Sequence, residues 1–259
     1  MQLFFQIGTA FILAIIVSGI AWRKKWLNLS GAIAATIIGT IVWTVGGWKG
    51  AIPLLLFFIT GSFLSLGEKQ EPGPGQKDEQ PRDFVQVFCN GGIASLSLLL
   101  FFFYRKEAFL LGYWASLAIS TADTWSSSIG TRFGGRVVDI KNGKPLARGL
   151  SGGISWIGTL GGLTGAFLIG LSSWLIQGWM SLAVVIVATG FIGMLVDSLL
   201  GSLLQAKYRL ASDVMAEYIP AGEDGVLVSG LKWMTNDWVN LLSNLLVAAL
   251  ALLTTEFAC

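Results

Sequence analysis

The sequence predicts an all-α, polytopic helical membrane protein with about eight transmembrane helices and its N-terminus outside. Three observations support this expectation: the composition, the recurrence of long apolar runs, and the uneven placement of basic residues. Of the 259 residues, 54% are hydrophobic and only 12% are charged, whereas a soluble domain is about 25% charged. Because lipid offers the backbone no hydrogen-bonding partner, we expect the long apolar runs to be helices.

Eight apolar runs approach the length of about 20 residues that a helix needs to cross a bilayer. In chain order they are 2–21, 28–46, 50–67, 87–104, 108–125, 152–174, 179–204 and 237–256.

The basic residues predict the orientation of these segments. With the N-terminus outside, the loops at 22–27, 68–86, 126–151 and 205–236 face the cytoplasm. These loops then hold all of the 17 Lys and Arg residues except Lys49, Arg105 and Lys106. Such an excess of positive charge is typical of cytoplasmic loops.

The chain divides into two parts on this interpretation. Residues 1–67 contain no acidic residue, and we expect them to be supporting helices that shape a lipid-facing groove. Residues 68–259 form the helical core, with cytoplasmic loops at 68–86, 126–151 and 205–236. Four glycines in the segment 152–174 have the small-xxx-small spacing that lets helices approach closely, so we expect them to serve packing. They are Gly158, Gly161, Gly162 and Gly165.

Three aspartates, Asp123, Asp197 and Asp237, lie at the predicted cytoplasmic ends of apolar segments. An ionised carboxylate within a bilayer costs roughly 2.5–3.5 kcal/mol on insertion scales, so such residues mark functional sites. Carboxylate and amide oxygens suit Mg²⁺ better than zinc or copper. The alternative is a buried hydrogen-bonded network without a metal. The absence of histidine excludes a His general base and a His-ligated metal.

Helical spacing groups further polar residues with these aspartates, because positions i and i+4 share a face. The predicted groups are Arg82, Gln86 and Asn90; Asp123 and Ser127; Asp197, Gly201 and Gln205; and Asn236, Asp237 and Asn240.

The loop 126–151 is rich in glycine and basic residues, which favours a phosphate site. Ser151, Gly152 and Gly153 are predicted to open the next helix, with Arg148 as the best basic candidate. The alternative is a mobile basic loop. The long loop 205–236 is a candidate lid, and we expect its acidic residues to be solvated. They are Asp213, Glu217, Glu223 and Asp224.

Across residues 80–245 these motifs resemble a known polytopic membrane family. It contains the phytyl-phosphate kinase of plastid and cyanobacterial vitamin E (tocopherol) synthesis and related animal transmembrane proteins. The matching stretches are Arg82-x3-Gln86-x3-Asn90-Gly, Ala122-Asp-Thr-Trp-Ser-Ser-x-Ile-Gly130, Arg148-Gly-x-x-Gly-Gly-Ile-Ser155, Asp197-Ser-x-x-Gly201-x3-Gln205 and Asn236-Asp-x-Val-Asn240. The chain departs from the family at Ser128, where Glu is usual, and at Leu150-Ser151, where Thr-Asn or Thr-Glu is usual. The kinase branch is expected to have Glu in place of Asp197.

The resemblance implies an integral-membrane kinase that uses Mg²⁺ and a nucleoside triphosphate, with CTP as the expected donor. It would phosphorylate phytyl or another prenyl monophosphate to the diphosphate, an isoprenoid product. The lipid tail would stay between helices, and the active site would face the cytoplasm of a bacterial plasma membrane or a thylakoid-type membrane. No nucleic-acid partner is expected, and the sequence leaves the oligomeric state open.

The resemblance also assigns roles to residues. The expected catalytic residues are Asp123, Asp197 and Asp237, which would bind the metal, and Arg148. The expected substrate- and phosphate-binding residues are Arg82, Gln86, Asn90, Thr124, Ser127, Arg132, Arg136, Lys144, Ser151, Gly152, Gly153, Ser198, Gln205, Asn236 and Asn240.

Other functions remain open from the residues alone. A lipid-phosphate cytidylyltransferase would use the same metal, nucleotide and lipid phosphate, and would differ by releasing pyrophosphate. A transporter or flippase for a lipid phosphate also carries carboxylates within the membrane. A non-catalytic member of the family is a further alternative, motivated by Ser128.

Overall fold

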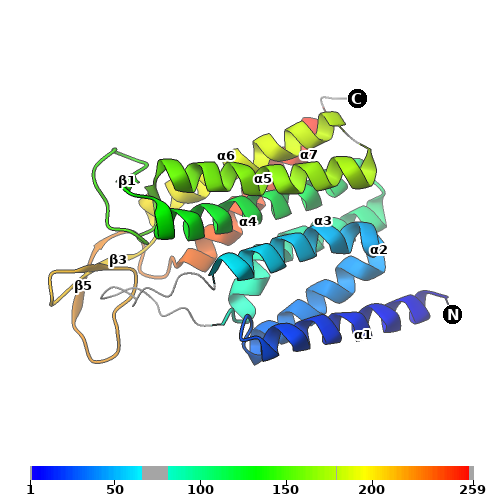
Figure 1. Ribbon diagram of the computed structural model, residues 1–259, viewed down its shortest axis with the longest axis horizontal. Helices are drawn as coiled ribbons and strands as arrows, with labels where there is room; N and C mark the ends of the chain where they lie inside the picture. The colour runs from blue at the N-terminus through cyan, green and yellow to red at the C-terminus, as the bar shows by residue number, and fades with distance from the viewer. Residues whose placement is uncertain (1, 66–80, 179, 257–259) are drawn as a thin grey trace.

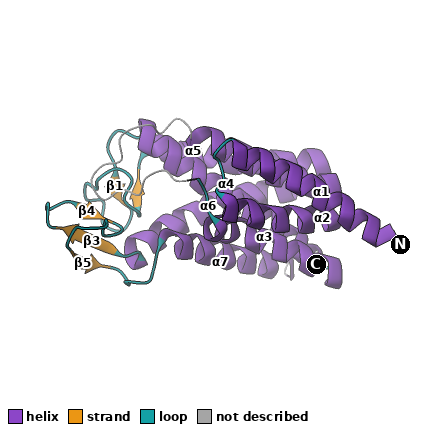
Figure 2. Cartoon of the chain, turned by 90° about the horizontal axis from the view of Figure 1, so that it is seen from below, coloured by secondary structure: helices purple, strands orange, loops and turns teal. Residues whose placement is uncertain are grey.

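The computed structural model describes residues 2–65, 81–178 and 180–256, which form a helical bundle with small strands at one end (Figures 1 and 2). Most of the predicted linker at 68–86 therefore lies outside the described residues. The helices are α1 (Gln2–Arg23), α2 (Leu29–Ser65), α3 (Phe84–Tyr104), α4 (Glu107–Phe133), α5 (Trp156–Gln177), α6 (Met180–Leu204) and α7 (Asn236–Glu256).

Helix α2 contains a sharp break at Gly47, where φ is 56° and ψ is −149°. Glycine suits this position because residues with a Cβ rarely adopt positive φ. Figure 1 shows the chain doubling back at this break. The two halves of α2 correspond to the predicted segments 28–46 and 50–67, and the other six predicted segments each coincide with one helix.

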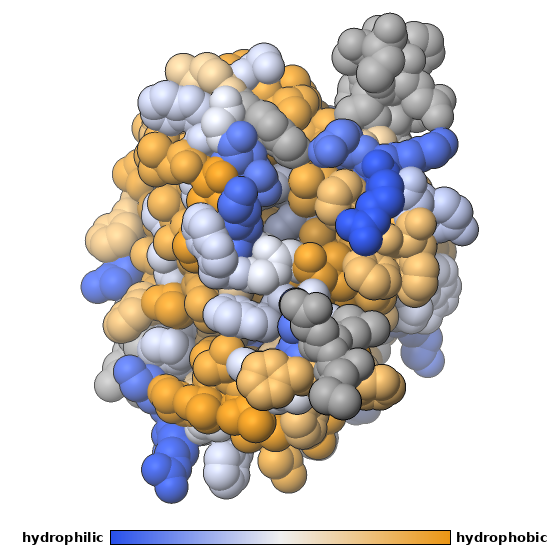
Figure 3. Space-filling model, turned by 90° about the vertical axis from the view of Figure 1, so that its right-hand side faces the viewer, coloured by the Kyte–Doolittle hydropathy of each residue, from blue (hydrophilic) through white to orange (hydrophobic). Residues whose placement is uncertain are grey.

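The prediction of a helical membrane protein is confirmed, but its number of spans is not. Among the described residues, α1, α2, α3, α5 and α6 are long and apolar enough to cross a membrane. Their outer faces carry large apolar side chains such as Phe11, Ile37 and Leu175. Figure 3 views the end of the bundle opposite the strands and shows mostly apolar surface. Eight crossings and an outside N-terminus stay predictions.

Helix α4 lies at the centre of the bundle and contacts α2, α3, α5, α6 and α7. Its residues Leu111–Ala122 are buried on every side. A helix surrounded by protein needs no continuous lipid-facing stripe, so it can carry polar residues. This explains why a smaller fraction of the residues in α4 is apolar than in the helices around it.

The glycines of α5 pack against α4, as predicted from their spacing. A Cβ atom at Gly158 would lie 2.9 Å from the carbonyl oxygen of Ser126, and one at Gly165 would lie 3.0 Å from that of Thr121. These separations are too short for a side chain. The absence of a Cβ thus lets the backbones of α4 and α5 touch.

Two loops contain short strands, which the prediction of an all-α fold did not include. Strands β1 (Val138–Asp139) and β2 (Gly153–Ile154) pair antiparallel. Strands β3 (Lys207–Leu210), β4 (Met215–Ala216) and β5 (Gly225–Ser229) form an antiparallel sheet in the order β4-β3-β5, with Tyr208 opposite Ala216 and Leu227. The loop 205–236 is therefore a folded cap.

Two predicted boundaries were wrong. Helix α4 continues to Phe133, so the first eight residues of the predicted loop 126–151 are helical. Helix α5 begins at Trp156, because the Ser155 hydroxyl accepts a hydrogen bond from the Gly158 N–H and caps the helix there. Ser151, Gly152 and Gly153 consequently precede the helix instead of opening it.

The strands and the connections that bear most of the basic residues lie at one end of the bundle (Figure 1). The start of α1 lies at the opposite end, together with the Gly47 turn. This arrangement is the one that the basic residues predict, but which end faces the cytoplasm stays a prediction.

Candidate functional site

A polar pocket of about 130 Å³ lies at the strand end of the bundle, between α4, α6, the start of α5 and the cap. Predicted site residues that line it are Asp123, Ser127, Ser151, Gly152, Gly153, Asp197, Ser198 and Asn236. Residues that were not predicted also line it: Ser126, Gly130, Thr131, Val137, Gly149, Leu150, Ser155, Gly158 and Glu217. The pocket therefore brings together four of the segments that the motifs singled out.

Asp123 of α4 and Asp197 of α6 both face this pocket. Asp123 is half-buried, whereas Asp197 is only 5% exposed. The Ser243 hydroxyl of α7 donates a hydrogen bond to Asp197 Oδ2 at 2.7 Å. Ser243 is itself fully buried, so it fixes the orientation of this carboxylate from behind.

A polar network extends behind the pocket through the membrane helices. The Ser116 hydroxyl of α4 donates to Asn244 Oδ1 of α7 at 2.7 Å, and Asn244 Nδ2 donates to the carbonyl oxygen of Asn240 at 2.9 Å. The Ser120 hydroxyl donates to the carbonyl oxygen of Asn90 on α3 at 2.8 Å. Such interhelical bonds fix the relative positions of α3, α4 and α7.

Asn240, a predicted ligand, is 6% exposed and does not line the pocket. Its Oδ1 has no hydrogen-bond partner among the described residues. A buried amide oxygen without a partner is costly, so this atom has spare capacity to accept a hydrogen bond from a bound water.

Glycines let the turn before α5 pack closely against the end of α6. Gly152 has a φ of 84°, and a Cβ there would lie 2.4 Å from the Cβ of Ser202. A Cβ at Gly201 would lie 2.0 Å from the Ser151 hydroxyl oxygen. The turn that precedes α5 therefore packs directly on the end of α6, and Ser151 lines the same pocket as Asp197.

Glu217 was predicted to be solvated, and this was wrong. It lines the pocket, where its carboxylate accepts hydrogen bonds from the Ser151 N–H and from Gln205 Nε2, the latter at 2.6 Å. Burial raises the pKa of Glu217, and the hydrogen bond from Ser151, the charge of Lys207 and the hydrogen bond from Gln205 oppose that rise. Asp213, Glu223 and Asp224 are exposed, as predicted.

Gln205 therefore does not line the pocket but supports it through its hydrogen bond to Glu217. It is 2% exposed, and its Oε1 has no partner among the described residues. Its amide holds Glu217, which in turn holds the turn at Ser151.

A buried lysine connects the cap with this region. Lys207 of β3 is 5% exposed. Burial lowers its pKa, while the charges of Asp139 and Glu217 oppose that shift. Burial alone would raise the pKa of Asp139, but hydrogen bonds from the Ser202 hydroxyl and the Lys141 N–H, with the nearby Lys207 charge, hold it below its ordinary value.

The predicted basic residues do not enter the pocket. Arg132, Arg136, Lys144 and Arg148 are exposed, and Arg148 Nη2 donates to the carbonyl oxygen of Gly135 at 3.2 Å. Within the described ranges, no Lys or Arg side chain lines the polar pocket. Arg132, Arg136 and Arg148 are each next in sequence to a residue that lines the pocket, whereas the lining itself is acidic and polar.

Four other predicted site residues line a second cavity. Arg82, Gln86, Asn90 and Thr124 lie at its polar end. Arg82 precedes α3, which begins at Phe84 with Asp83 as its N-cap; Gln86 completes the capping box by accepting from the Asp83 N–H at 3.2 Å. Gln86 and Asn90 lie on α3 as predicted, whereas Arg82 joins them from the segment before the helix, and all three line this second cavity instead of the aspartate pocket.

Asp237 does not join the other two aspartates in lining the pocket. It lies on α7, which packs against α3, and its charge acts on Cys89 of α3. Among the described residues, no three Asp, Glu, Cys or His side chains converge to hold a metal ion. The arrangement thus differs from the predicted three-aspartate set.

The donor chemistry nevertheless fits Mg²⁺ with two aspartates. Mg²⁺ in phosphate-transfer sites is held by one or two carboxylates together with substrate phosphates and waters. Asp123 and Asp197 supply the carboxylates, and the pocket is lined by hydroxyl groups and no soft ligand. Since the lining is acidic, a polyphosphate could enter it only with a cation.

Comparison with known proteins places this architecture in a family. The sequence profile described as integral membrane protein DUF92 matches residues 12–248. An uncharacterised membrane protein of Methanocaldococcus jannaschii is 34% identical over 229 residues, which cover 88% of this chain and 94% of that protein. No solved structure matches the chain.

Two relatives come from the plant Arabidopsis thaliana. Protein PGR is 28% identical over 285 residues, covering 98% of this chain and 97% of that protein. The chloroplastic protein VTE6 is 26% identical over 254 residues, covering 95% of this chain and 70% of that protein. These matches confirm the resemblance to a membrane family with plastid members.

Proposed function

The chain belongs to the integral membrane protein family DUF92, and we propose that it is a membrane phosphotransferase. In this proposal, a nucleoside triphosphate, with CTP as the expected donor, phosphorylates phytyl or another prenyl monophosphate to the diphosphate. The observation that carries the proposal is the pair Asp123 and Asp197, delivered by different helices to one pocket that no described basic side chain lines.

Phosphoryl transfer needs positioning and charge neutralisation more than covalent help from the protein. An oxygen of the prenyl monophosphate attacks the γ-phosphorus, the bond from that phosphorus to the β–γ bridging oxygen breaks, and the nucleoside diphosphate leaves. The attacking phosphate oxygen is already ionised. A chain without histidine is therefore adequate for this reaction.

Asp123 and Asp197 would hold Mg²⁺, which supplies neutralisation of the phosphate charge when it is bound. Ser243 would keep the Asp197 carboxylate in one orientation. The backbone N–H groups of Gly149 and Gly152 and the Ser127 hydroxyl would position phosphate oxygens. The N–H groups of Leu150, Ser151 and Gly153 already donate to protein oxygens. The exposed side chains of Arg132, Arg136 and Arg148, each next in sequence to a lining residue, would attract the nucleotide. Exposed positive charge raises the local concentration of anions.

A transporter is the second candidate, because another cavity lies at the opposite end of the bundle. It has a volume of about 310 Å³, and Lys49, Glu107 and Gln177 line it together with Tyr113 and Trp114 of α4. Along α4, however, the residues from Ala115 to Ala122 between these two cavities are all buried. This packing favours an enzyme with a one-sided site.

The decisive experiment is a product analysis with purified protein in lipid nanodiscs. The protein is incubated with Mg²⁺, CTP or ATP, and geranyl, farnesyl, geranylgeranyl or phytyl monophosphate, and products are identified by mass. A kinase gives the prenyl diphosphate and a nucleoside diphosphate. A cytidylyltransferase instead gives pyrophosphate and a CDP-linked lipid, which would replace the proposed reaction.

Matched variants connect the activity with the pocket. Asp123→Asn should abolish turnover, whereas Asp213→Asn should leave it unchanged, because Asp213 is an exposed residue of the cap that pairs with Arg209. If the wild type forms neither product, or if Asp123→Asn turns over as fast as the wild type, the proposal is wrong.

A further inference from the structure

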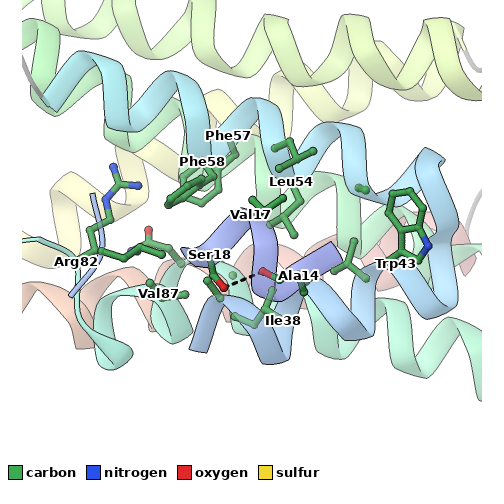
Figure 4. A pocket seen from close by; sticks show the side chains of 18 of the residues that line it. Ala14, Val17, Ser18, Ile38, Trp43, Leu54, Phe57, Phe58, Arg82 and Val87 are labelled. Carbon is green, nitrogen blue, oxygen red and sulfur yellow. Dashed lines mark hydrogen bonds between the residues drawn. The ribbon is translucent and has the colours of Figure 1, made fainter. Parts of the chain in front are cut away.

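An apolar cavity of about 230 Å³ lies between α1, both halves of α2 and α3. Figure 4 shows its long shape, with Arg82 at one end and Trp43 at the other. Leu54, Phe57 and Phe58 contribute part of the lining from the second half of α2. The predicted supporting helices thus enclose a space instead of packing solidly.

The cavity suits a hydrocarbon. Most of the side chains that line it are apolar. An apolar cavity of roughly 150 Å³ in a protein interior stays free of water and accepts a small hydrocarbon. The present cavity is larger, so it can hold a segment of a lipid chain.

The polar end of the cavity is held in place by backbone hydrogen bonds. The Arg82 N–H donates to the carbonyl oxygen of Trp26, and the Arg82 carbonyl oxygen accepts from the Asn28 N–H, both at 3.1 Å. A Cβ at Gly61 would lie 3.2 Å from Arg82 Nη2 and 3.0 Å from Thr124 Cγ2. The guanidinium group therefore passes over α2 at Gly61 and reaches the neighbourhood of Thr124.

Thr124 and Asp123 bring the two cavities to the same turn of α4. Thr124 lines the apolar cavity, while its neighbour Asp123 lines the polar pocket. Consecutive Cα atoms are about 3.8 Å apart, and successive side chains of a helix point about 100° apart. The two cavities therefore approach this turn from different sides of α4, with Arg82 beside Thr124.

The cavity also reaches the lipid-facing surface. Val17 of α1 lines it and is 41% exposed. A chain longer than the cavity could leave past Val17 into the bilayer, so the whole tail need not be enclosed.

We propose that this cavity binds the hydrocarbon segment of the prenyl monophosphate that is nearest the phosphate, with Arg82 contacting the phosphate at the end of the cavity beside Thr124. The identity of the lipid rests on the proposed function. The single narrow space with one charged end favours one isoprenoid chain over a two-chain phospholipid. The cavity would then determine which chains bind productively.

Photo-crosslinking tests the binding site without requiring turnover. The probe is a farnesyl monophosphate analogue that carries a diazirine on its first isoprene unit, added to the full chain in nanodiscs without nucleotide. After irradiation, labelled peptides are mapped by mass spectrometry. We expect labels on cavity-lining residues of α1, α2 and α3, and we expect unlabelled farnesyl monophosphate to compete better than farnesol.

Two matched substitutions make the test specific. Leu54→Trp fills the cavity, whereas Ile59→Trp adds the same bulk on an outward position of the same half-helix, where Ile59 is 39% exposed. Leu54→Trp should reduce cavity labelling by about tenfold, since contact with roughly two methylene groups is lost. Ile59→Trp should label like the wild type.

The charged end has its own variant. Arg82→Gln should remove the preference for farnesyl monophosphate over farnesol in the competition, and Arg209→Gln in the exposed part of the cap should retain it. If Arg82→Gln does not fold, the Leu54 and Ile59 pair still decides the result.

The outcomes separate this inference from the proposed function. Cavity labelling that Leu54→Trp abolishes supports the inference even if no product forms with any nucleotide, in which case only the proposed reaction fails. Prenyl diphosphate formation with labels spread over the outer faces, or with labelling unaffected by Leu54→Trp, overturns the inference and leaves the proposed reaction intact. Equal competition by phosphatidic acid would show that the cavity takes phospholipid chains and would also overturn it.

Discussion

Replacing Ser243 with alanine removes one hydroxyl group from behind the candidate site. In the wild type, this hydroxyl donates to Asp197 Oδ2 at 2.7 Å. Ser243 is 0% exposed and Asp197 is 5% exposed, so bulk water does not readily replace the lost donor. The substitution therefore leaves a buried carboxylate oxygen without this partner while changing the packing by a single atom.

The size of the effect follows from the charge on the acceptor. A hydrogen bond to a charged group contributes about 1.5–3 kcal/mol. Each 1.36 kcal/mol corresponds to a factor of ten in rate. If the bond serves to hold Asp197 for the metal and phosphate, we expect kcat/KM to fall roughly 10- to 100-fold and the Mg²⁺ concentration for half-maximal activity to rise.

The assay is formation of prenyl diphosphate at varied Mg²⁺, and Ser173→Ala is the matched control. Ser173 is also 0% exposed, but its hydroxyl donates to the carbonyl oxygen of Gly170 within α5 at 2.7 Å. Its loss should alter stability slightly and leave the Mg²⁺ requirement unchanged.

Two results would refute this reasoning. One is a Ser243→Ala protein with wild-type kcat/KM and wild-type Mg²⁺ requirement. The other is a Ser173→Ala protein with the same loss as Ser243→Ala, since that would assign the effect to general weakening of the bundle.

Three further predictions concern other parts of the site. Asp123→Asn should lower turnover by at least about 100-fold, as for loss of one key electrostatic group, yet unfold at the same or a higher temperature in detergent because a half-buried charge is removed; a drop in melting temperature with proportional loss of activity would contradict this. Gly201→Ala should displace the turn at Ser151 and reduce activity, since its Cβ would lie 2.0 Å from the Ser151 hydroxyl oxygen, whereas Gly19→Ala, with nothing within 4 Å, should be neutral in the same assay. The lowered pKa of Asp139 means that its contribution to stability is fully present above the ordinary value of 3.8 and is lost as pH falls through the lower folded-state pKa; melting temperature measured against pH should fall in that acidic window for the wild type and less for Asp139→Asn, and identical profiles would reject the role.

The apolar segments could be predicted from the sequence because bilayer thickness fixes their length. The gap between the predicted segments 28–46 and 50–67 matches the break at Gly47. The chain turns back there with a positive φ, which glycine adopts easily. Small-residue spacing likewise identified the contact of α5 with α4. These features depend on local composition and on a period that is visible along the chain.

The cap and parts of the site could not be predicted in the same way. Glu217 looks like any polar loop residue, and only its tertiary contacts with Ser151 and Gln205 place it in the pocket. Strands of two residues, such as β1, carry no detectable period. The start of α5 was mislocated because the glycines before it were favoured over the capping signal of Ser155.

One missed residue, Ser243, did carry a signal. On α7, Asn236, Asn240 and Ser243 have the spacing i, i+4 and i+7, which places them on one helical face. That stripe points to Ser243, whereas Asp237 lies about 100° around the helix from Asn236. Asp237 was grouped with Asp123 and Asp197 because its charge was given more weight than the helical face that Asn236, Asn240 and Ser243 share.

The reversal at Gly47 also decides where attached proteins would be found. It adds one passage of the chain through the bundle, so α1 starts and α7 finishes at the same end (Figure 1). If every passage crosses the membrane, as the sequence predicts, a tag fused ahead of α1 and a tag fused behind α7 would share one compartment, and both would be separated by the membrane from one inserted in the sheet β4-β3-β5.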